Sequence, residues 1–297
     1  MLELKGKVAV VTGGGSGIGA ALARAFASQE MDVVVADVDI AGAEKVAAEV
    51  RSTGRRALAV QTDVSKLAAV EALAERTYQE LGGCHVLCNN AGVLVMGSLE
   101  TRSVKDWEWV LGVNLWGVIH GVLAFLPRML AQPGEKHIVN TGSTAGLMPT
   151  PGVGVYATAK YAVVGLSEHL RLDLAPHAIG VSVLCPGGVQ TQILRSERNR
   201  PSELGSPPVS ADDLRRMAAG AERPADEMQP PEAIAAAVIE GIRANDAYIL
   251  THAHYRKGVE ARCAALMSGF DKADARTASS TRHGPTALEH TLRRDPS

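Results

Sequence analysis

The sequence predicts an α/β fold: a doubly wound, mainly parallel sheet between two layers of helices. Short apolar runs alternate with helical patterns from the first residues onward, which is typical of successive β-α-β units with right-handed crossovers. These runs are continuously apolar, as expected for strands that helices cover on both faces. The 297 residues, 46% of them hydrophobic, suffice for one large core.

Each element is expected from its local pattern, in chain order. Apolar runs predict strands at residues 7–12, 32–37, 56–61, 86–89, 137–141, 181–185 and 247–250. Helical periodicity predicts helices at residues 17–28, 41–52, 66–81, 104–131, 156–175, 231–244 and 255–270. Residues 195–231 are rich in proline, serine and charge, and they predict a long irregular excursion of the kind that forms substrate loops. We therefore expect one domain over residues 1–271, followed by a polar, disordered tail over 272–297.

Composition excludes several classes of protein. A net charge of −2 and 4% aromatic residues favour neither nucleic acid nor an anionic membrane surface as a partner. The apolar stretches look too short or too interrupted to span a bilayer. The four cysteines have neither zinc-ligand nor disulfide-framework spacing, and His252 and His254 have no companion ligand at metal spacing. A cytoplasmic protein without a metal is expected.

A glycine-rich turn joins the first predicted strand to the first helix. Its sequence from residue 12 is Thr-Gly-Gly-Gly-Ser-Gly-Ile-Gly. Glycines at this place let backbone amides approach a pyrophosphate at the N-terminus of the helix, where the helix dipole favours negative charge. This position between strand and helix is the one that a dinucleotide fingerprint requires. The predicted cofactor contacts here are Gly13, Gly15, Ser16, Gly17, Ile18 and Gly19.

An acidic residue closes the second predicted strand and bears on the choice of cofactor. Asp37 stands where a carboxylate accepts hydrogen bonds from the adenosine ribose. It would repel the 2′-phosphate of NADP, and no Lys or Arg lies within residues 13–19 or directly after Asp37. NAD is therefore preferred over NADP. Asp63 and Val64, after the third strand, could border the adenine, although Asp63 could equally begin the next helix.

Taken together, the motifs resemble those of the short-chain dehydrogenase/reductase family. The glycine turn matches the family's T-G-x-x-x-G-I-G pattern, residues 89–92 match N-N-A-G, and residues 156–160 match Y-x-x-x-K. The resemblance covers residues 5–195. It implies a Rossmann-like sheet of about seven parallel strands, NAD(P) as cofactor and assembly as a homodimer or homotetramer. The C-terminal extension is similar to that of family members that include bacterial enzymes oxidising benzylic alcohols.

The candidate catalytic residues are Tyr156, Lys160, Ser143 and Asn114. A free tyrosine, with a pKa of about 10, is a poor base at neutral pH, and a nearby ammonium group favours the phenolate. Tyr156 and Lys160 share a helix face, so we expect Lys160 to lower the pKa of Tyr156, the acid/base. Ser143 follows a strand and would hold the substrate oxygen. The resemblance gives Asn114 a role in a proton relay through Lys160; a core asparagine satisfying backbone groups is the alternative.

The remaining cofactor contacts follow the fourth and sixth strands. Asn89 is predicted to be structural, tying neighbouring strands together. The resemblance places a second group beside the ribose and the nicotinamide: Asn90, Ala91, Gly92, Pro186, Gly187, Val189 and Thr191.

Three sets of residues outside the motifs have more than one interpretation. Trp107, Trp109 and Trp116 favour packing, with a subunit interface as the alternative. The arginines of the predicted loop favour a solvated surface, with an anionic substrate group as the alternative; they are Arg195, Arg198 and Arg200. The apolar candidates for the substrate site are Val93, Met96, Leu147, Val153 and Val189.

The sequence as a whole predicts an NAD-dependent oxidoreductase. Its substrate is expected to be a small molecule, a secondary, hydrophobic, aromatic or benzylic alcohol and its ketone, with Tyr156 as general acid/base. Two alternatives stay open: a reductase of 3-oxoacyl or steroid ketones, and a regulator that binds NAD without chemistry, although such a protein would not need Tyr156 and Lys160.

Overall fold

A computed structural model describes residues 1, 3–205 and 228–276. The chain divides into two units, Met1–Thr251 and His252–Ser297. In the described part of the first unit, seven parallel strands form one sheet in the order β3-β2-β1-β4-β5-β6-β7. The strands are β1 Val8–Thr12, β2 Asp32–Asp37, β3 Ala57–Gln61, β4 Val86–Asn89, β5 Lys136–Thr141, β6 Ile179–Cys185 and β7 Tyr248–Leu250. The predicted doubly wound, Rossmann-like architecture is confirmed.

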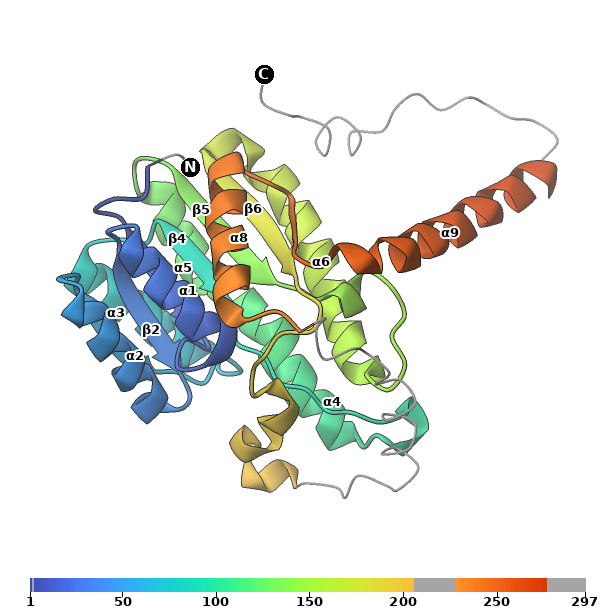
Figure 1. The fold of residues 1–297 in the computed structure, drawn as a ribbon, viewed down its shortest axis with the longest axis horizontal. Helices are drawn as coiled ribbons and strands as arrows, with labels where there is room; N and C mark the ends of the chain where they lie inside the picture. The colour runs from blue at the N-terminus through green and yellow to red at the C-terminus, as the bar shows by residue number, and fades with distance from the viewer. Residues whose placement is uncertain (2, 206–227, 277–297) are drawn as a thin grey trace. The chain divides into compact units, whose positions relative to one another are not determined.

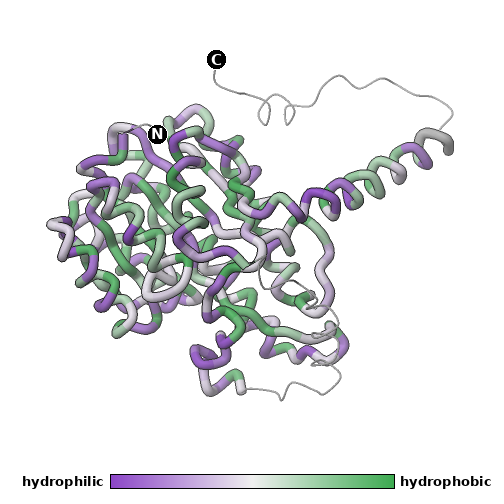
Figure 2. The backbone as a smooth tube through the Cα atoms, in the orientation of Figure 1, coloured by the Kyte–Doolittle hydropathy of each residue, from purple (hydrophilic) through white to green (hydrophobic). Residues whose placement is uncertain are grey.

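Helices cover both faces of this sheet (Figure 1). One face carries α1 Gly17–Ser28, α2 Ile40–Ser52 and α8 Pro231–Ala244, with α1 and α8 side by side. Their buried side chains, Phe26 and Ile234 among them, form one core with that face. The other face carries α3 Leu67–Leu81, α5 Gly117–Ala131 and α6 Gly154–Leu174, whose side chains form a second core. The strands form the hydrophobic centre between these layers (Figure 2).

The winding of the sheet reverses at β1, and this reversal places the site. Val10 of β1 pairs with Val34 of β2 on one side and with Leu87 of β4 on the other. The chain therefore winds outward in both directions from the middle of the sheet. Loops from adjacent strands part at such a point, and the carboxyl ends of β1 and β4 open into a crevice.

The structure differs from the sequence predictions in two segments near that crevice. The helix expected at 104–131 is α4 Val104–Leu111 and α5, joined by a π-helical turn at Gly112–Trp116. The excursion expected at 195–231 begins with two 3-10 helices, Ile193–Asn199 and Ser202–Leu204, while α8 starts at Pro231. Residues 206–227 of the predicted excursion lie outside the described residues.

The span Val104–Ala131 also corrects the expectation that every apolar stretch is too short for a bilayer. Its 28 residues, with a mean hydropathy of 1.7 in the most apolar window, meet the length and composition of a membrane span. Half of that window is buried inside the protein, and Phe125 and Met129 belong to the second core. The apolar character of α5 therefore serves packing against the sheet and α3.

The second unit contains α9, Arg256–Arg276. The helix predicted at 255–270 is present and is longer than expected. Residues 272–276, assigned to the polar tail, continue the helix, and the rest of that tail lies outside the described residues. The single domain over residues 1–271 stays a prediction.

Candidate active site

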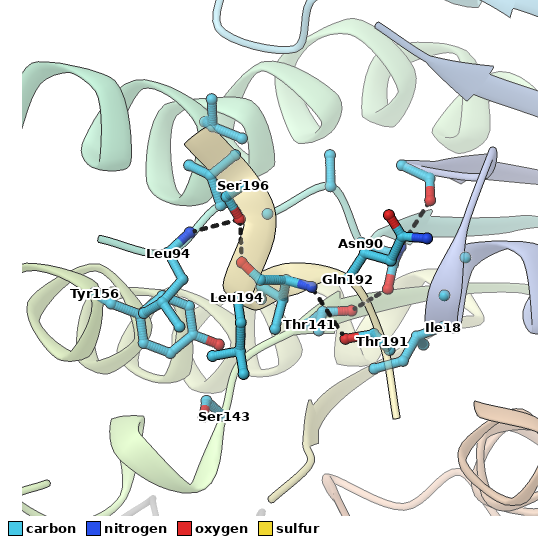
Figure 3. Close-up of a pocket in the computed structure, with 18 of the residues that line it drawn as sticks. Ile18, Asn90, Leu94, Thr141, Ser143, Tyr156, Thr191, Gln192, Leu194 and Ser196 are labelled. Atoms are coloured by element: carbon cyan, nitrogen blue, oxygen red, sulfur yellow. Dashed lines mark hydrogen bonds between the residues drawn. The ribbon is translucent and has the colours of Figure 1, made fainter. Parts of the chain in front are cut away.

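A cavity of about 990 Å³ opens at the carboxyl ends of the central strands. Its volume is at the upper end of the range for small-molecule and cofactor sites, roughly 300–1,000 Å³. Every cofactor-binding and catalytic residue predicted from the sequence lines it, except Asn114. Figure 3 shows Ile18, Asn90 and Thr191 on one side of the view and Tyr156 and Ser143 on the other. One continuous space therefore joins the glycine turn to the candidate acid/base.

The glycine turn is built for close backbone approach. A Cβ on Gly13 would lie 2.8 Å from Cα of Ala91, and a Cβ on Gly19 would collide with the carbonyl oxygen of Gly13. Gly13 also has a φ of 64°, in the left-handed region, which glycine adopts without a steric penalty. The side chain of Ser16, at the N-cap of α1, forms no capping hydrogen bond. It therefore does not occupy the backbone amides at the start of the helix. These amides suit a pyrophosphate.

Hydrogen bonds hold the glycine turn against the loop after β4. The hydroxyl oxygen of Thr12 accepts from the amides of Asn90 (2.9 Å) and Ala91 (3.2 Å). The side-chain amide of Asn90 donates back to the carbonyl of Thr12 at 3.0 Å, and its oxygen accepts from the Thr141 hydroxyl (Figure 3). Asn90 thus borders the cavity mainly as a brace between β1, β4 and β5.

Asp37 lies at the end of β2 with its carboxylate beside the glycine turn. Its Oδ2 accepts from the amide of Gly15 at 2.9 Å, and its Oδ1 accepts from the amide of Asp39 at 3.0 Å. The described cationic side chains that line the cavity are Lys160 and Arg198. Lys160 is bonded to Thr141 at the end of β5, three strands from β2 in the sheet. The Asp37 corner of the cavity is therefore acidic and suits ribose hydroxyls.

Ser143 and Tyr156 lie next to each other on the wall of the cavity (Figure 3). The Ser143 hydroxyl accepts from the amide of Ala145 at 3.1 Å, which orients the serine side chain at the start of a short 3-10 helix. Burial raises the pKa of Tyr156 to about 12, while its hydrogen bond with Ser143 acts in the opposite direction. The two hydroxyls are thus coupled, and the tyrosine is protonated at neutral pH.

Lys160 is almost fully buried beside them. Its Nζ donates to the carbonyl of Thr141 at 2.7 Å and lies 5.5 Å from the centre of the Tyr156 ring. Burial lowers the pKa of Lys160 to about 8, because a buried site disfavours the charged form. From the sequence, Lys160 is expected to lower the pKa of Tyr156. In the protein itself, burial of the phenol outweighs any such effect.

Asn114 is the predicted residue that does not line the cavity. It is fully buried in the π-helical turn, where its side chain accepts from the amide of Val93 and donates to the carbonyl of Val93, both at 2.8 Å. A Cβ built on Gly92 would lie 3.5 Å from Asn114 Oδ1 and 3.8 Å from Lys160 Nζ. Asn114 therefore satisfies backbone groups, as one alternative held, and also lies close to Lys160.

Comparison with known proteins agrees with this geometry. The sequence model of the short chain dehydrogenase family matches residues 7–202. The chain belongs to this family. It is 31% identical to a CLA biosynthesis dehydrogenase/reductase of Lactiplantibacillus plantarum, over 90% of this chain and 96% of that protein. It is 32% identical to a C alpha-dehydrogenase of a Sphingobium species, over 90% and 87%.

A solved structure extends the likeness to the cofactor. A short chain dehydrogenase/reductase from Burkholderia phymatum, determined in complex with NAD, superimposes with a TM-score of 0.83 at 38% identity. The alignment covers 96% of this chain and all of that chain. This short-chain dehydrogenase is accordingly an oxidoreductase of the NAD(P)-binding type.

Asn89 and Asp63 both form hydrogen bonds that shape the chain at or just after the end of a strand. Asn89 donates to Asn140 Oδ1 on β5 at 2.9 Å, which confirms that it ties neighbouring strands together. Asp63 Oδ1 accepts from both the amide and the hydroxyl of Ser65, and Asp63 lines the cavity. It therefore shapes the turn before α3, as one alternative held, while also bordering the site.

The structure adds residues to the substrate end of the cavity that the sequence did not single out. Trp109, considered only for packing or an interface, is buried and lines the cavity. The 3-10 segment after β6 contributes another wall, made of Gln192, Ile193, Leu194, Ser196, Arg198, Asn199 and Pro201. The adjacent apolar residues Ile193 and Leu194 indicate a buried or ligand-facing position. The sequence around them does not indicate that they lie at this cavity.

Two of the alternatives for individual side chains are corrected. Leu147 does not line the cavity and instead packs against the cluster of Val118 and Val163. Arg200 is neither solvated nor directed at an anionic ligand, because it is buried in an ion pair with Asp106. Arg198 does line the cavity, with Nη1 donating to the carbonyls of Gln192 and Arg195.

Proposed function

We propose that this short-chain dehydrogenase interconverts a secondary, hydrophobic alcohol and its ketone with NAD as the cofactor. The observation that carries the proposal is the grouping of Ser143, Tyr156 and Lys160 in the cavity that also contains the glycine turn and Asp37. Two adjacent hydroxyls and a buried amine are what a carbonyl or carbinol oxygen needs for proton transfer. They leave the carbinol carbon to exchange a hydride with the cofactor.

The chemistry divides between the cofactor and the chain. When bound, NAD supplies the hydride acceptor, and its positive ring favours the phenolate. Tyr156 Oη takes the proton of the substrate hydroxyl in oxidation and returns it in reduction. Ser143 donates a hydrogen bond to the same oxygen and stabilises its developing charge. Loss of the hydroxyl proton to Tyr156 and of a hydride from the carbinol carbon would turn a secondary alcohol into its ketone.

Lys160 provides the next position for that proton, and Asn114 would help to hold a water molecule on the route. Lys160 has a pKa near neutrality, about 8, so its amine can gain and lose a proton in the working range. Asn114 lies beyond it with its oxygen bonded to the Val93 amide. A water molecule held between these groups would complete a relay from Tyr156, which is the role that the family resemblance implies for Asn114.

The walls of the cavity favour an apolar substrate. Val93, Met96, Trp109, Val153 and Leu194 all line it, and an indole ring offers an aromatic substrate a flat surface. The similarity to a C alpha-dehydrogenase supports a dehydrogenase activity. The similarity to a CLA biosynthesis dehydrogenase/reductase supports either direction of the reaction, and the reduction of 3-oxoacyl or steroid ketones stays an alternative.

Tyr156→Phe is expected to lower kcat for alcohol oxidation by a factor of about 100 to 10,000, because the proton acceptor is lost. The dissociation constant of NADH should change little, since the phenyl ring keeps its packing. Initial rates with 1-phenylethanol and NAD, and NADH fluorescence titration, measure the two effects. Tyr161→Phe, on the same helix but outside the cavity, is the matched control. If Tyr156→Phe keeps a kcat close to that of the wild type, Tyr156 is not the acid/base.

The pH dependence of the reaction should have opposite signs in the two directions. Burial raises the pKa of Tyr156, so the deprotonated form that oxidation requires becomes more populated as pH rises. Lys160 loses its charge above a pKa of about 8, which should limit the increase beyond that pH. We expect kcat/KM to rise with pH for oxidation and to fall for ketone reduction. Profiles for both directions that rise together would contradict the assignment.

Asp37→Ser is expected to weaken the preference for NAD. The wild-type enzyme should have a higher kcat/KM with NAD than with NADP, because the carboxylate repels a 2′-phosphate. Its replacement should reduce that ratio by about tenfold. Glu44→Ser, which removes an exposed acid from α2 outside the cavity, should leave the ratio unchanged. A wild-type preference for NADP would overturn the choice of cofactor.

We also propose that the chain self-associates, as the family resemblance implies, and that α5, with Trp116 at its N-cap, forms the contact. Trp116, Leu123 and Leu130 recur every seven residues and are 52%, 55% and 44% exposed, so they form an apolar stripe on one side of the helix. Leu123→Glu should shift the mass from dimer or tetramer toward monomer in sedimentation. Val104→Glu, a change at an exposed residue of α4, is the control. A wild-type monomer would refute the proposal.

A further inference from the structure

A buried ion pair joins the segment after β6 to α4. Arg200 follows the 3-10 helix Ile193–Asn199, and its Nη1 lies 2.7 Å from Oδ1 of Asp106. The two side chains are 2% and 0% exposed. The Arg200 guanidinium also lies over the Trp109 ring, 5.0 Å from its centre. One side chain therefore contacts both an acid and an aromatic residue of the same short helix.

Asp106 is a rigid partner for this arginine. Its Oδ2 accepts from the amide of Ser103 at 2.8 Å and from the Ser103 hydroxyl at 3.0 Å, within a capping box at the start of α4. Burial acts to raise the pKa of Asp106, but the hydrogen bonds from Ser103 and Arg200 outweigh it and hold the pKa below its ordinary value. The carboxylate is thus charged, and it is held in place by the capping box as well as by Arg200.

Further hydrogen bonds connect the segment to its neighbours. Ser196 Oγ accepts from the amide of Leu94 at 3.1 Å (Figure 3), and Lys105 Nζ donates to the carbonyl of Glu203 at the surface. Arg200 Nη2 donates to the carbonyl of Leu204 at 3.3 Å, and Leu204 packs against the cluster that contains Trp109 and Tyr156. The arginine therefore links the first 3-10 helix, the second one and α4.

The position of this link matters because the groups it holds form a wall of the cavity. Ile193, Leu194, Ser196 and Pro201 of the segment line the cavity, and so does Trp109. Arg200 and Asp106 themselves do not line it. Their effect on a ligand can only be indirect, through the placement of those walls.

We propose that Arg200, by pairing with Asp106 and stacking on Trp109, is the positioning residue that sets the shape of the substrate end of the cavity and hence the bulk of the alcohol accepted. This inference rests on the proposed function. A buried ion pair does not by itself imply net stability, because desolvation of the two charges offsets their attraction. The contribution of the Arg200–Asp106 pair is geometric, because the planar, forked guanidinium defines both the distance and the orientation of its partners.

The test separates positioning from plain stability by removing one charge or both. Arg200→Met leaves Asp106 buried without its counter-ion, which destabilises the fold. The double variant Arg200→Met with Asp106→Asn removes both charges, and the asparagine oxygen can still accept from Ser103. We expect the double variant to recover the unfolding midpoint in urea. A misplaced wall should nevertheless raise KM about tenfold for 1-phenylethanol in both variants, with the dissociation constant of NADH unchanged.

Substrate bulk and backbone exchange provide the further readouts. In both variants the ratio of kcat/KM for 1-(2-naphthyl)ethanol to that for 1-phenylethanol should shift by roughly tenfold, and amide exchange over residues 193–204 should accelerate by roughly tenfold. Arg200→Lys, which keeps the charge, should retain part of the wild-type substrate ratio and of the wild-type protection from amide exchange. Arg195→Met, at an exposed arginine of the same segment outside the cavity, is the matched control and should resemble the wild type.

The outcomes distinguish this inference from the proposed function. If the double variant regains both stability and wild-type KM, or if exchange over 193–204 is unchanged, Arg200 has no positioning role. If the wild type binds NADH but oxidises no alcohol and reduces no ketone of the series, the proposed function fails. In that case the exchange experiment on the full chain still decides whether Arg200 holds the segment.

Discussion

The site depends on the meeting of β1 and β4 at the middle of the sheet. The winding reverses there, so the two loops that follow these strands part and leave room for a ligand. What holds them at the right separation is the exchange of hydrogen bonds between Thr12 and Asn90. The glycine turn could not approach Ala91 as closely as it does if this brace were displaced. The cofactor end of the cavity is thus a consequence of sheet topology reinforced by two polar side chains.

The buried amine of Lys160 imposes a second constraint, on charge. A cation at a nearly inaccessible position is costly unless a polar group stabilises it, and the carbonyl of Thr141 is the group that does so here. The result is a lysine whose pKa falls to about 8 beside a tyrosine whose pKa rises to about 12. Burial thus moves the two pKa values apart, because it disfavours the charged form of each group. It leaves an amine that is easily deprotonated beside a phenol that keeps its proton. Under the proposed function, the positive charge that favours the phenolate would come from the oxidised cofactor. Proton transfer to Tyr156 would then depend on the cofactor being bound.

The parts of the fold that the sequence predicted well are those encoded by neighbouring residues. The bounds of α1, β2, β4 and α8 agree with expectation, because an apolar run between turn residues has few alternatives in this fold. The π-helical turn at Gly112–Trp116 left no trace in the pattern, since the residues on both sides stay apolar and helical. Asn114 could be picked out as a polar residue among them, but its partner, the backbone of Val93, could not.

The same distinction explains why the sequence locates the candidate acid/base and the cofactor turn better than it locates the walls of the substrate end. The groups proposed to transfer the proton occur within one strand end and one helix, Ser143 to Lys160, and the cofactor turn is a single run of residues. The substrate end is assembled from the loop after β4, from α4 and from the segment after β6, which meet only through contacts such as Arg200 with Asp106. No local pattern distinguishes an arginine that will be buried in such a pair from Arg195 or Arg198 nearby. Because these contacts join segments that lie far apart in the sequence, the shape of the substrate end depends on how its walls are held, which no single run of residues encodes.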